Sequence, residues 1–367
     1  MKKILYIVST LKKTGPIVVL ANIVKYLDRN QFEPTILTLS VESNDSLVNY
    51  FVDELGIKVD SLKLSRIEGI FKGKSKILEY IESNNIDVVH THGIRADGFL
   101  KNIDIAKVLT LHNYPYYDYP MKFGKIKSNL MIFNHMSTIK SNSKNCIACA
   151  KTISNEFKKD DLNLNYIQNG VDIDKYKSLK NDEKNSLKER LNIDNKKKIF
   201  ITVGSLIPRK DMETVIKGFK LFNKDNNSIL LIAGDGFEKE KLKTISDKNI
   251  IFLGNISNVV EYLQLSDCFI SASLAEGLPN TVLEAMSCGL PTILSDISSH
   301  RELYENEKGN FFKTKDVSKL SSLLKLIDDE FYKQHKLSLK IIKEKFSAKV
   351  MSEKYQKIYM EKINESI

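Results

Sequence analysis

The sequence repeats one pattern along its length: a short apolar segment, a turn rich in glycine or polar residues, and then an amphipathic segment. This alternation is typical of parallel β-sheets covered by helices on both faces. In the first half it predicts five strands, at 3–8, 33–39, 87–91, 108–111 and 146–150. In the second half it predicts five more, at 199–203, 229–233, 250–253, 268–271 and 291–294. We therefore expect an α/β protein with two doubly wound domains.

The boundary between the two halves follows the turn signal Asn169-Gly170, after which a charged segment with few apolar residues runs from Lys175 to Lys198. We expect an N-terminal domain over 1–170 and a C-terminal domain over 171–349. The final segment, 350–367, has apolar residues at helical spacing and predicts a helix. Periodicity does not say which domain this helix packs against, and we assign it to the N-terminal domain.

Apolar segments and cysteines limit where the chain resides. No apolar segment approaches the roughly 20 residues that a membrane-spanning helix needs. The apolar start lacks a signal-peptide cleavage site, so we expect a cytoplasmic protein. Cys146 and Cys149 have no second pair or nearby histidines to complete a zinc site, and we expect both to be buried.

The formal net charge of +10 favours an anionic partner, which could be nucleic acid, anionic lipid or a phosphorylated ligand. The sequence has no zinc-finger spacing, helix-turn-helix or RNP-type strand, so we expect no nucleic-acid partner.

The segment most informative about chemistry is SLAEGLPNTVLEAMSCGLP, residues 273–291. Its Pro279 is typical of a helix start and its Gly289 of a helix end. Glu276 then lies on the preceding loop and Glu284 on the helix. In isolation such a pair is more often a loop glutamate and a solvated helix glutamate.

The start of this predicted helix would suit a diphosphate, because open backbone amides and the helix dipole favour anions. A carboxylate on each side could accept hydrogen bonds from sugar and ribose hydroxyls. The amides in question belong to Leu278, Pro279, Asn280 and Thr281, with proline contributing its position rather than a donor.

The 273–291 segment resembles the donor-site motif of glycosyltransferase family 4. These are retaining enzymes of the GT-B fold, in which two Rossmann-like doubly wound parallel-sheet domains face each other across a cleft. The resemblance extends over nearly the whole chain. Eight further markers stand in order, at 14–16, 87–92, 110–113, 167–172, 203–205, 209–211, 233–236 and 252–254. The N-terminal half resembles capsular and exopolysaccharide glycosyltransferases, whose acceptors are undecaprenyl-linked saccharides.

The resemblance implies roles for the matching residues. Glu276 would hold hydroxyls of the donor sugar, Glu284 the ribose, and the amides of 278–281 the phosphate oxygens. Arg209 and Lys210 would neutralise the leaving diphosphate. Many relatives have arginine where Ser205 stands, so Arg209 would substitute for it. The remaining donor-binding candidates are Gly15, Gly204, Ser205, Gly234, Gly236 and Gly254.

Two histidines stand at predicted strand ends, where α/β sheets bind ligands. By the resemblance, His112 would be a catalytic residue beside the donor sugar; the alternative is a buried, hydrogen-bonded histidine. We expect His92 to contact the acceptor and His90 to serve packing. His135 and His300 have no motif support.

Two other patterns are set aside. Asp172-Ile-Asp174 matches the DxD motif that binds a metal in the other major glycosyltransferase fold, but it follows a turn at the domain boundary, so we expect no metal. The Gly15 loop has no GxGxxG, which argues against a dinucleotide oxidoreductase. We expect no cofactor, since the nucleotide-sugar is a substrate.

We therefore expect a retaining hexosyltransferase that moves a sugar from a nucleoside-diphosphate sugar, UDP by family frequency, to a saccharide or lipid-linked saccharide of a cell-surface polysaccharide. The resemblance implies a front-face reaction in which the leaving diphosphate helps to remove the acceptor proton. The alternatives are a nucleotide-sugar epimerase of the same fold and a non-catalytic nucleotide-sugar-binding partner of another transferase.

The segment 116–127 mixes aromatic residues with lysines, which would suit docking at an anionic membrane surface. A mobile loop beside the active site with solvated lysines is the alternative.

Overall fold

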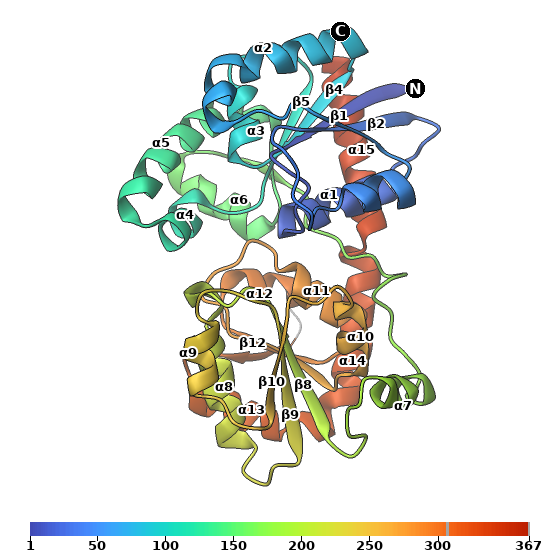
Figure 1. Ribbon diagram of the computed structural model, residues 1–367, viewed down its shortest axis with the longest axis vertical. Helices are drawn as coiled ribbons and strands as arrows, with labels where there is room; N and C mark the ends of the chain where they lie inside the picture. Colours follow the sequence, from blue (N-terminus) through green and yellow to red (C-terminus); the bar gives the residue numbers. More distant parts are fainter. Residues whose placement is uncertain (306–307, 366–367) are drawn as a thin grey trace. The chain divides into compact units, whose positions relative to one another are not determined.

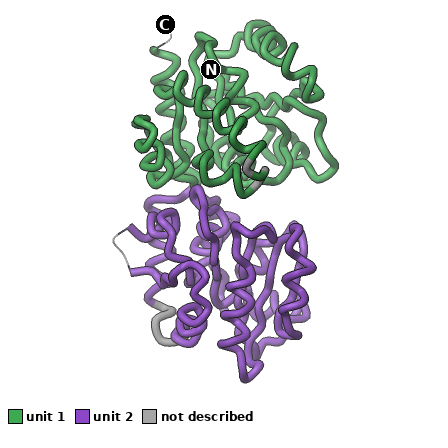
Figure 2. The backbone as a smooth tube through the Cα atoms, turned by 90° about the vertical axis from the view of Figure 1, so that its left-hand side faces the viewer, with its two compact units in different colours: residues 1–170, 348–367 green, residues 171–347 purple. Residues whose placement is uncertain are grey.

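The computed structural model describes residues 1–305 and 308–365, and it divides into two compact units (Figure 1). Unit 1 comprises residues 1–170 and 348–367, and unit 2 comprises residues 171–347. Figure 2 shows the C-terminal segment in the colour of unit 1, into which the chain returns after completing unit 2.

Unit 1 is built on a parallel sheet of seven strands in the order β3-β2-β1-β4-β5-β6-β7. Residues 4–8 of the central strand are fully buried, because helices cover both faces of the sheet and an uninterrupted apolar strand fits there. The strands are β1 (Lys2–Val8), β2 (Phe32–Thr38), β3 (Lys58–Ser61), β4 (Val88–His92), β5 (Lys107–Leu111), β6 (Cys146–Ala148) and β7 (Asn165–Tyr166).

The C-terminal helix α15 is part of the core of unit 1. Tyr355 and Tyr359 are buried among residues of β1 and α1, and the Tyr359 hydroxyl lies 2.8 Å from Nδ1 of His90. The helices of this unit are α1 (Gly15–Lys25), the π-helix η1 (Tyr50–Glu54), α2 (Arg66–Asn84), α3 (Ile94–Phe99), α4 (Pro115–Phe123), α5 (Lys125–Ser141), the 3₁₀ turn η2 (Ser143–Asn145), α6 (Lys151–Phe157), the 3₁₀ turn η3 (Lys158–Asp160) and α15 (Ala348–Glu365).

Unit 2 has a parallel sheet of six strands in the order β10-β9-β8-β11-β12-β13. They are β8 (Lys198–Val203), β9 (Ser228–Ala233), β10 (Ile250–Gly254), β11 (Cys268–Ser271), β12 (Thr292–Ser295) and β13 (Asn310–Phe312). The helices are α7 (Asn181–Arg190), the 3₁₀ turn η4 (Pro208–Lys210), α8 (Met212–Phe222), α9 (Lys239–Thr244), α10 (Val259–Leu265), α11 (Asn280–Ser287), α12 (Ser298–Tyr304), α13 (Val317–Lys325) and α14 (Ile327–Lys345).

Both strand orders reverse direction beside the first strand of the unit, between β1 and β4 and between β8 and β11. Ligands of doubly wound sheets bind at the carboxyl ends of the strands at such a reversal. The loops after β8 and β11 carry the cations and carboxylates that the sequence singles out, so the fold places them at this position of unit 2.

The ten predicted strands are confirmed, with ends shifted by at most two residues. The prediction omitted β3, β7 and β13, which are short edge strands without a continuous apolar run. Strand β6 ends at Ala148, so Cys149 lies just beyond it rather than inside it. All four cysteines are free and buried, which confirms the predicted burial of Cys146 and Cys149.

Across residues 1–305 and 308–365, no helix is both long enough and apolar enough to cross a membrane.

Candidate functional site

The chemical centre of unit 2 is a carboxylate held by two cations. Lys210 Nζ donates to Oε1 of Glu276 at 2.5 Å, and Arg209 Nη1 donates to Oε2 at 2.7 Å. The side chain of Glu276 is only 8% exposed, and those of Arg209 and Lys210 are 19% and 14% exposed. The structure thus brings together three of the four residues predicted to be catalytic.

The backbone fixes this cluster in place. Arg209 and Lys210 lie on the 3₁₀ turn η4 after β8, and Glu276 lies on the loop after β11. The amide of Leu274 donates to the carbonyl of Arg209 at 2.8 Å, and Arg209 Nη1 also donates to the carbonyl of Ala275 at 2.6 Å. These bonds join the two loops directly, so the cations do not depend on flexible side chains alone for their position.

Glu276 is also supported by two serines that sequence reasoning missed, Ser273 and Ser295. Ser273 Oγ donates to Oε1 of Glu276 at 2.7 Å, and Ser295 Oγ donates to the Ser273 carbonyl at 2.6 Å. His300 is buried beside them, with Nδ1 2.8 Å from the carbonyl of Ser295. Burial lowers the pKa of His300 to about 4, so it stays neutral. Ser273 lies within the recognised motif, but only the fold reveals His300 as its neighbour.

The ionisation of Glu276 follows from these contacts. Burial alone would raise the pKa of Glu276, but the charges of Lys210 and Arg209 and the hydrogen bonds from Lys210 and Ser273 hold that pKa well below its ordinary value. A carboxylate has about four acceptor positions. Lys210, Ser273 and Arg209 occupy three of them, which leaves one on Oε2 for a ligand hydroxyl.

Two of the predicted donor-binding glycines, Gly234 and Gly236, are required by close packing of the loops after β8 and β9. A Cβ atom at Gly234 would lie 2.0 Å from the carbonyl oxygen of Gly204, and one at Gly236 would lie 2.3 Å from that of Leu206. The amide of Gly234 donates to the carbonyl of Gly254 at 2.8 Å, and that of Gly236 to the Asp235 carboxylate. These glycines shape the loop beside Lys210, and their amides are engaged within the protein.

Ser205 lies on the same loop and is exposed. Arg209, four residues further along the chain, forms the ion pair with Glu276. That Arg209 substitutes for the arginine that many relatives have at the Ser205 position stays a prediction.

Helix α11 begins and ends as the sequence predicts. Pro279 is its N-cap, and Gly289 follows its last turn with a φ of +76°. Glycine is required at position 289 for two reasons. Its φ is positive, and a Cβ atom there would clash with the His335 ring. Leu278 and Pro279 are buried, whereas Asn280 and Thr281 at the helix start are partly exposed.

Glu284 lies on α11 with 8% of its surface exposed. The hydroxyl of Tyr176 is hydrogen-bonded to its carboxylate, and Ser287 Oγ donates to the Tyr176 carbonyl at 2.5 Å. Burial and the Glu284 carboxylate raise the pKa of Tyr176 far above its ordinary value. Tyr176 is a neighbour that the sequence analysis missed, because it comes from the charged segment after the domain boundary.

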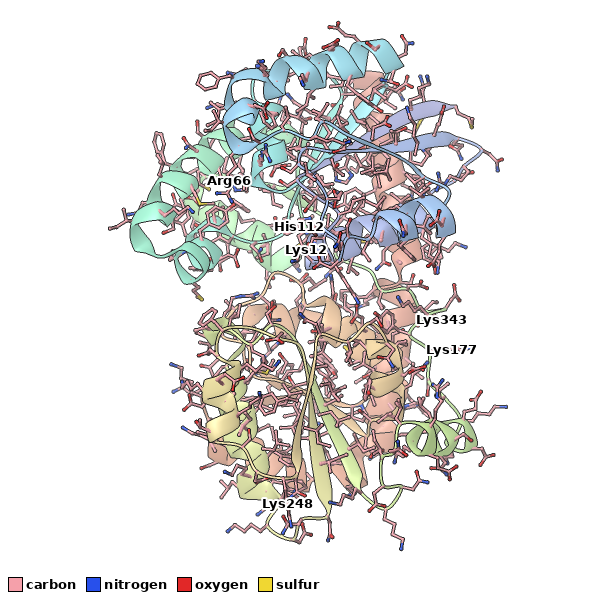
Figure 3. The ribbon with its side chains drawn as sticks, viewed as in Figure 1. Lys12, Arg66, His112, Lys177, Lys248 and Lys343 are labelled. Carbon is pink, nitrogen blue, oxygen red and sulfur yellow. The ribbon has the colours of Figure 1, made fainter. Side chains whose placement is uncertain are left out.

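In unit 1 the two histidines at the strand ends form a pair. Nδ1 of His92, at the end of β4, lies 3.0 Å from Nε2 of His112. His112 follows β5 and is labelled in Figure 3. Burial lowers the pKa of His112 to about 4 and that of His92 well below its ordinary value, so both rings are neutral. Cys149 Sγ donates to the His112 carbonyl at 3.3 Å, which fixes the backbone there.

His90 and His135 have structural partners. His90 is fully buried, with its ring nitrogens 2.8 Å from the Tyr359 hydroxyl and 2.7 Å from Oγ1 of Thr110. This agrees with the packing role expected for it. His135 is buried in unit 1, with its ring nitrogens near the Tyr119 hydroxyl and the Asp97 carboxylate.

Gly15, a predicted donor-binding residue, is the first residue of α1.

The Asp172-Ile-Asp174 pattern forms a turn. Oδ1 of Asp172 accepts hydrogen bonds from the amides of Asp174 and Lys175 at 3.2 and 3.3 Å, and Asp172 is buried. Within residues 1–305 and 308–365, no three histidine, cysteine or acidic side chains gather as a metal would need.

The segment 116–127 is helical: it comprises most of α4 and the start of α5. Tyr119 is buried against His135, and the Tyr117 hydroxyl donates to Glu156 at 2.8 Å. The alternative of a loop is therefore wrong for this segment.

Two Rossmann-like units, one with a buried cation–carboxylate cluster at its strand ends, define a glycosyltransferase of the GT-B fold. Two family models match the chain, Glycosyltransferase Family 4 over residues 14–175 and Glycosyl transferases group 1 over residues 183–345. The chain belongs to the family 4 glycosyltransferases.

Relatives of known role are similar over most of the chain. The O-antigen biosynthesis glycosyltransferase WclY of Escherichia coli is 26% identical over 97% of this chain and 98% of its own length. An Escherichia coli UDP-Gal:alpha-D-GlcNAc-diphosphoundecaprenol alpha-1,3-galactosyltransferase is 27% identical over 78% and 76% of the two chains. The structure of HepE from Anabaena with UDP and glucose superposes with a TM-score of 0.80 at 16% identity, covering 98% of this chain and all of HepE.

Proposed function

We propose that this glycosyltransferase takes a hexose from a UDP-sugar and transfers it, with retention of the anomeric configuration, to a lipid-linked saccharide in cell-surface polysaccharide synthesis. The observation that carries this proposal is the pairing of both Arg209 and Lys210 with the buried Glu276. The names of the relatives support the donor and acceptor classes, since one is a UDP-galactose enzyme acting on a diphosphoundecaprenol acceptor.

The donor would bind along the loops of unit 2. Arg209 and Lys210 carry two positive charges against one on Glu276, and this excess suits a diphosphate. The start of α11 would hold phosphate oxygens, and the fourth acceptor position of Glu276 would take a sugar hydroxyl. Glu284, steadied by Tyr176, would accept from the ribose.

The proposed reaction is a front-face substitution. The bond between the anomeric carbon and the diphosphate oxygen breaks, and the acceptor hydroxyl forms the new bond on the same face. A leaving phosphate oxygen takes the acceptor proton, so no enzymatic nucleophile is needed. Lys210 and Arg209 stabilise the charge that develops on the diphosphate, which is the step where preorganised donors contribute most.

His112 would act as a neutral hydrogen-bond donor rather than a base. Nε2 of His92 is buried and has no partner within the described residues. An unpaired buried N–H is rarer in proteins than an unpaired acceptor, so the hydrogen of His92 belongs on Nδ1. His92 then donates to Nε2 of His112, and His112 carries its own hydrogen on Nδ1, the atom available to a sugar oxygen.

We place the reaction at the inner face of the membrane, because a lipid-linked acceptor would be presented there. We also propose that no metal or other cofactor takes part, with Arg209 and Lys210 neutralising the diphosphate.

Substitution of Lys210 tests the donor site. Lys210→Ala should lower turnover about 100-fold or more, with a smaller loss of UDP binding, because the lysine acts on charge that develops in the transition state. Lys248→Ala is the control, since Lys248 is an exposed lysine of the same unit (Figure 3). UDP and UDP-glucose should raise the melting temperature of the parent protein. Parent-like turnover of Lys210→Ala would refute the assignment.

Two product analyses separate the alternatives. Incubation with UDP-sugar alone should leave the sugar unisomerised, whereas an epimerase would convert it. With a lipid-linked acceptor, NMR of the product should show the donor's anomeric configuration in the new linkage. An inverted linkage would refute the front-face reaction but not the donor site.

A further inference from the structure

Helix α2 presents its larger apolar residues to solvent. Ile67, Ile70 and Phe71 are 70%, 77% and 81% exposed, and their spacing of three and four residues places them on one face of the helix. Isolated exposed apolar residues are ordinary in proteins, but a contiguous group on one helix face usually marks a contact surface.

The opposite face of α2 explains why these residues are not needed for packing. Gly69 and Gly73 face α3, where an added Cβ would lie 2.6 Å from the Arg95 guanidinium and 2.5 Å from the Phe99 ring. The first half of α2 therefore contacts its own unit through glycines. Ile67, Ile70 and Phe71 lie on the solvent-exposed face of α2 and contribute little to the packing of unit 1.

Helix α5 has a second exposed apolar face. Ile126, Leu130 and Phe133 are 93%, 66% and 72% exposed, and they lie four and three residues apart. The other face of α5 is buried by Ile132, Met136 and Ile139. A helix that is apolar on both sides is expected where both sides are covered.

Lys101 is hydrogen-bonded to one residue of each exposed face, Lys74 of α2 and Ser137 of α5. Lys74 continues the exposed face of α2, and its Nζ donates to the carbonyl of Lys101 at 3.3 Å. Lys101 Nζ donates to Oγ of Ser137 at 2.7 Å, and Ser137 continues the exposed face of α5. The α2–α5 surface comprises Ile67, Ile70, Phe71, Ile126, Leu130 and Phe133. Figure 1 labels the two helices that carry these residues.

The first half of α2 and the whole of α5 are rich in basic residues. Residues 66–76 of α2 include four basic residues, Arg66, Lys72, Lys74 and Lys76, against the single acid Glu68 (Figure 3). Helix α5 includes Lys127 and Lys140, and its sequence has no acidic residue. Apolar faces bordered by lysine and arginine are typical of helices that lie in the interface of an anionic bilayer.

We propose that the α2–α5 surface docks unit 1 on an anionic lipid bilayer, with Ile70, Phe71 and Leu130 entering the headgroup region and the surrounding cations contacting lipid phosphates. This inference rests on the proposed function, because a lipid-linked acceptor would be delivered from the same bilayer. It keeps Ile126 and Lys127 of the segment 116–127 in the membrane contact but leaves out Tyr117 and Tyr119, which are engaged within unit 1.

Sedimentation of the full chain with phosphatidylcholine vesicles, with and without phosphatidylglycerol, tests the proposal. The parent should bind the anionic vesicles and bind the neutral ones far less. The double variant Ile70→Ser/Phe71→Ser should lower the partition coefficient at least about tenfold, since two large side chains no longer bury apolar surface. The matched control is Leu221→Ser/Leu326→Ser, which removes two exposed leucines of unit 2.

Charge-reversal variants test whether the basic residues contribute to binding of the anionic bilayer. Lys72→Glu/Lys76→Glu should lower binding to anionic vesicles about tenfold or more, with a loss that shrinks at high salt. Lys177→Glu/Lys248→Glu changes the charge of unit 2 by the same amount and should leave binding close to that of the parent (Figure 3).

Three results would overturn the proposal: no binding to anionic vesicles, equal binding by the serine variant and the parent, or equal binding to anionic and neutral vesicles. A parent dimer that Ile70→Ser/Phe71→Ser converts to a monomer would also overturn it, because the surface would then be an interface between copies. The melting-temperature shift with UDP-glucose should persist in every variant. It reports on unit 2, so failure of docking and failure of the donor assignment are distinguishable.

Discussion

The cluster at the strand ends of unit 2 is charged, whereas the cluster at the strand ends of unit 1 is neutral. At the carboxyl ends of β8 and β11, Lys210 and Arg209 hold Glu276 ionised in a buried position. At the carboxyl ends of β4 and β5, His92 and His112 form a pair that burial keeps neutral. Each cluster lies at the carboxyl ends of two neighbouring parallel strands, and the local partners make the difference.

Burial disfavours charge in both clusters, but only one contains charges of both signs. In unit 2 the attraction between Glu276 and two cations outweighs the cost of desolvation. In unit 1 the two histidines face each other, and no carboxylate of the described residues 1–305 and 308–365 bonds to either, so the uncharged form is favoured. A charged cluster suits a diphosphate, and a neutral donor suits the hydroxyls of a sugar.

The strongest way to break this contrast is to remove the charge from unit 2. Glu276→Gln should reduce turnover by about 100-fold to 1,000-fold, because an amide cannot hold both cations or accept from the sugar as a carboxylate does. Steady-state kinetics with a UDP-sugar and a lipid-linked acceptor would measure it.

Glu240→Gln is the control for this substitution, since Glu240 is a glutamate of unit 2 with 81% of its side chain exposed. Its turnover should match that of the parent. If Glu276→Gln retained turnover within about twofold, the cluster would be a structural ion pair rather than a catalytic one.

Acid should destabilise the two clusters in different pH windows. The pKa of Glu276 is lowered on folding, so its contribution is present above the unfolded value near 4.3 and is lost as pH falls further. The pKa values of His90, His92 and His112 are also lowered, so the unfolded state gains protons first and unit 1 loses stability as pH falls below about 6.5. We expect a loss on the order of 1–2 kcal/mol per histidine by pH 5.

Hydrogen exchange at pH 7 and pH 5, corrected for the intrinsic pH dependence, would show this difference. Protection of 88–92 and 107–111 should fall more than that of 198–203 and 268–271, because unit 1 has three such histidines and unit 2 has only His300 among those with a lowered pKa. Urea unfolding of Glu276→Gln should in turn be less sensitive to pH below about 4 than that of the parent. Equal loss of protection in both sheets would contradict the assignment of the windows.

The sequence was sufficient for the elements that follow strong local rules. Apolar runs gave the central strands, and Pro279 and Gly289 gave the ends of α11. The resemblance to family 4 glycosyltransferases also pointed to Glu276, Lys210 and Arg209. Their hydrogen bonds were not predictable, because the residues are 66 or 67 positions apart and meet only when β8 and β11 pair.

What the sequence did not reveal depends on contacts between distant segments. Ser273 and His300 complete the surroundings of Glu276, and Tyr176 bonds Glu284 from beyond the domain boundary. The exposed face of α2 was missed for another reason. Its apolar residues have the spacing of a core helix, and only the packing of Gly69 and Gly73 shows which face is inside.

A smaller effect is expected in unit 1, where a neutral hydrogen bond replaces the ionic ones. His112→Phe should lower turnover about tenfold, the value of one hydrogen bond between uncharged groups. Because the pKa of His112 is about 4, turnover of the parent should show no titration of this residue between pH 5.5 and 8. A change of rate near pH 6.5 that is present in the pH–rate profile of the parent and absent from that of His112→Phe would contradict a neutral donor.

The smallest effect concerns His92, for which the predicted acceptor contact stays a prediction and for which we propose a role in orienting His112. His92→Phe removes the donor to Nε2 of His112 and should lower turnover about threefold to tenfold, whereas His92→Gln keeps an N–H donor and should recover part of the loss. Nitrogen-15 NMR of the imidazoles separates orientation from mere packing: His112 should carry its hydrogen on Nδ1 in the parent and exchange between both nitrogens in His92→Phe. A parent spectrum with the hydrogen on Nε2 of His112 would reverse the pair and make His112 an acceptor, which would remove the neutral donor from unit 1 and with it half of the contrast between the two sheets.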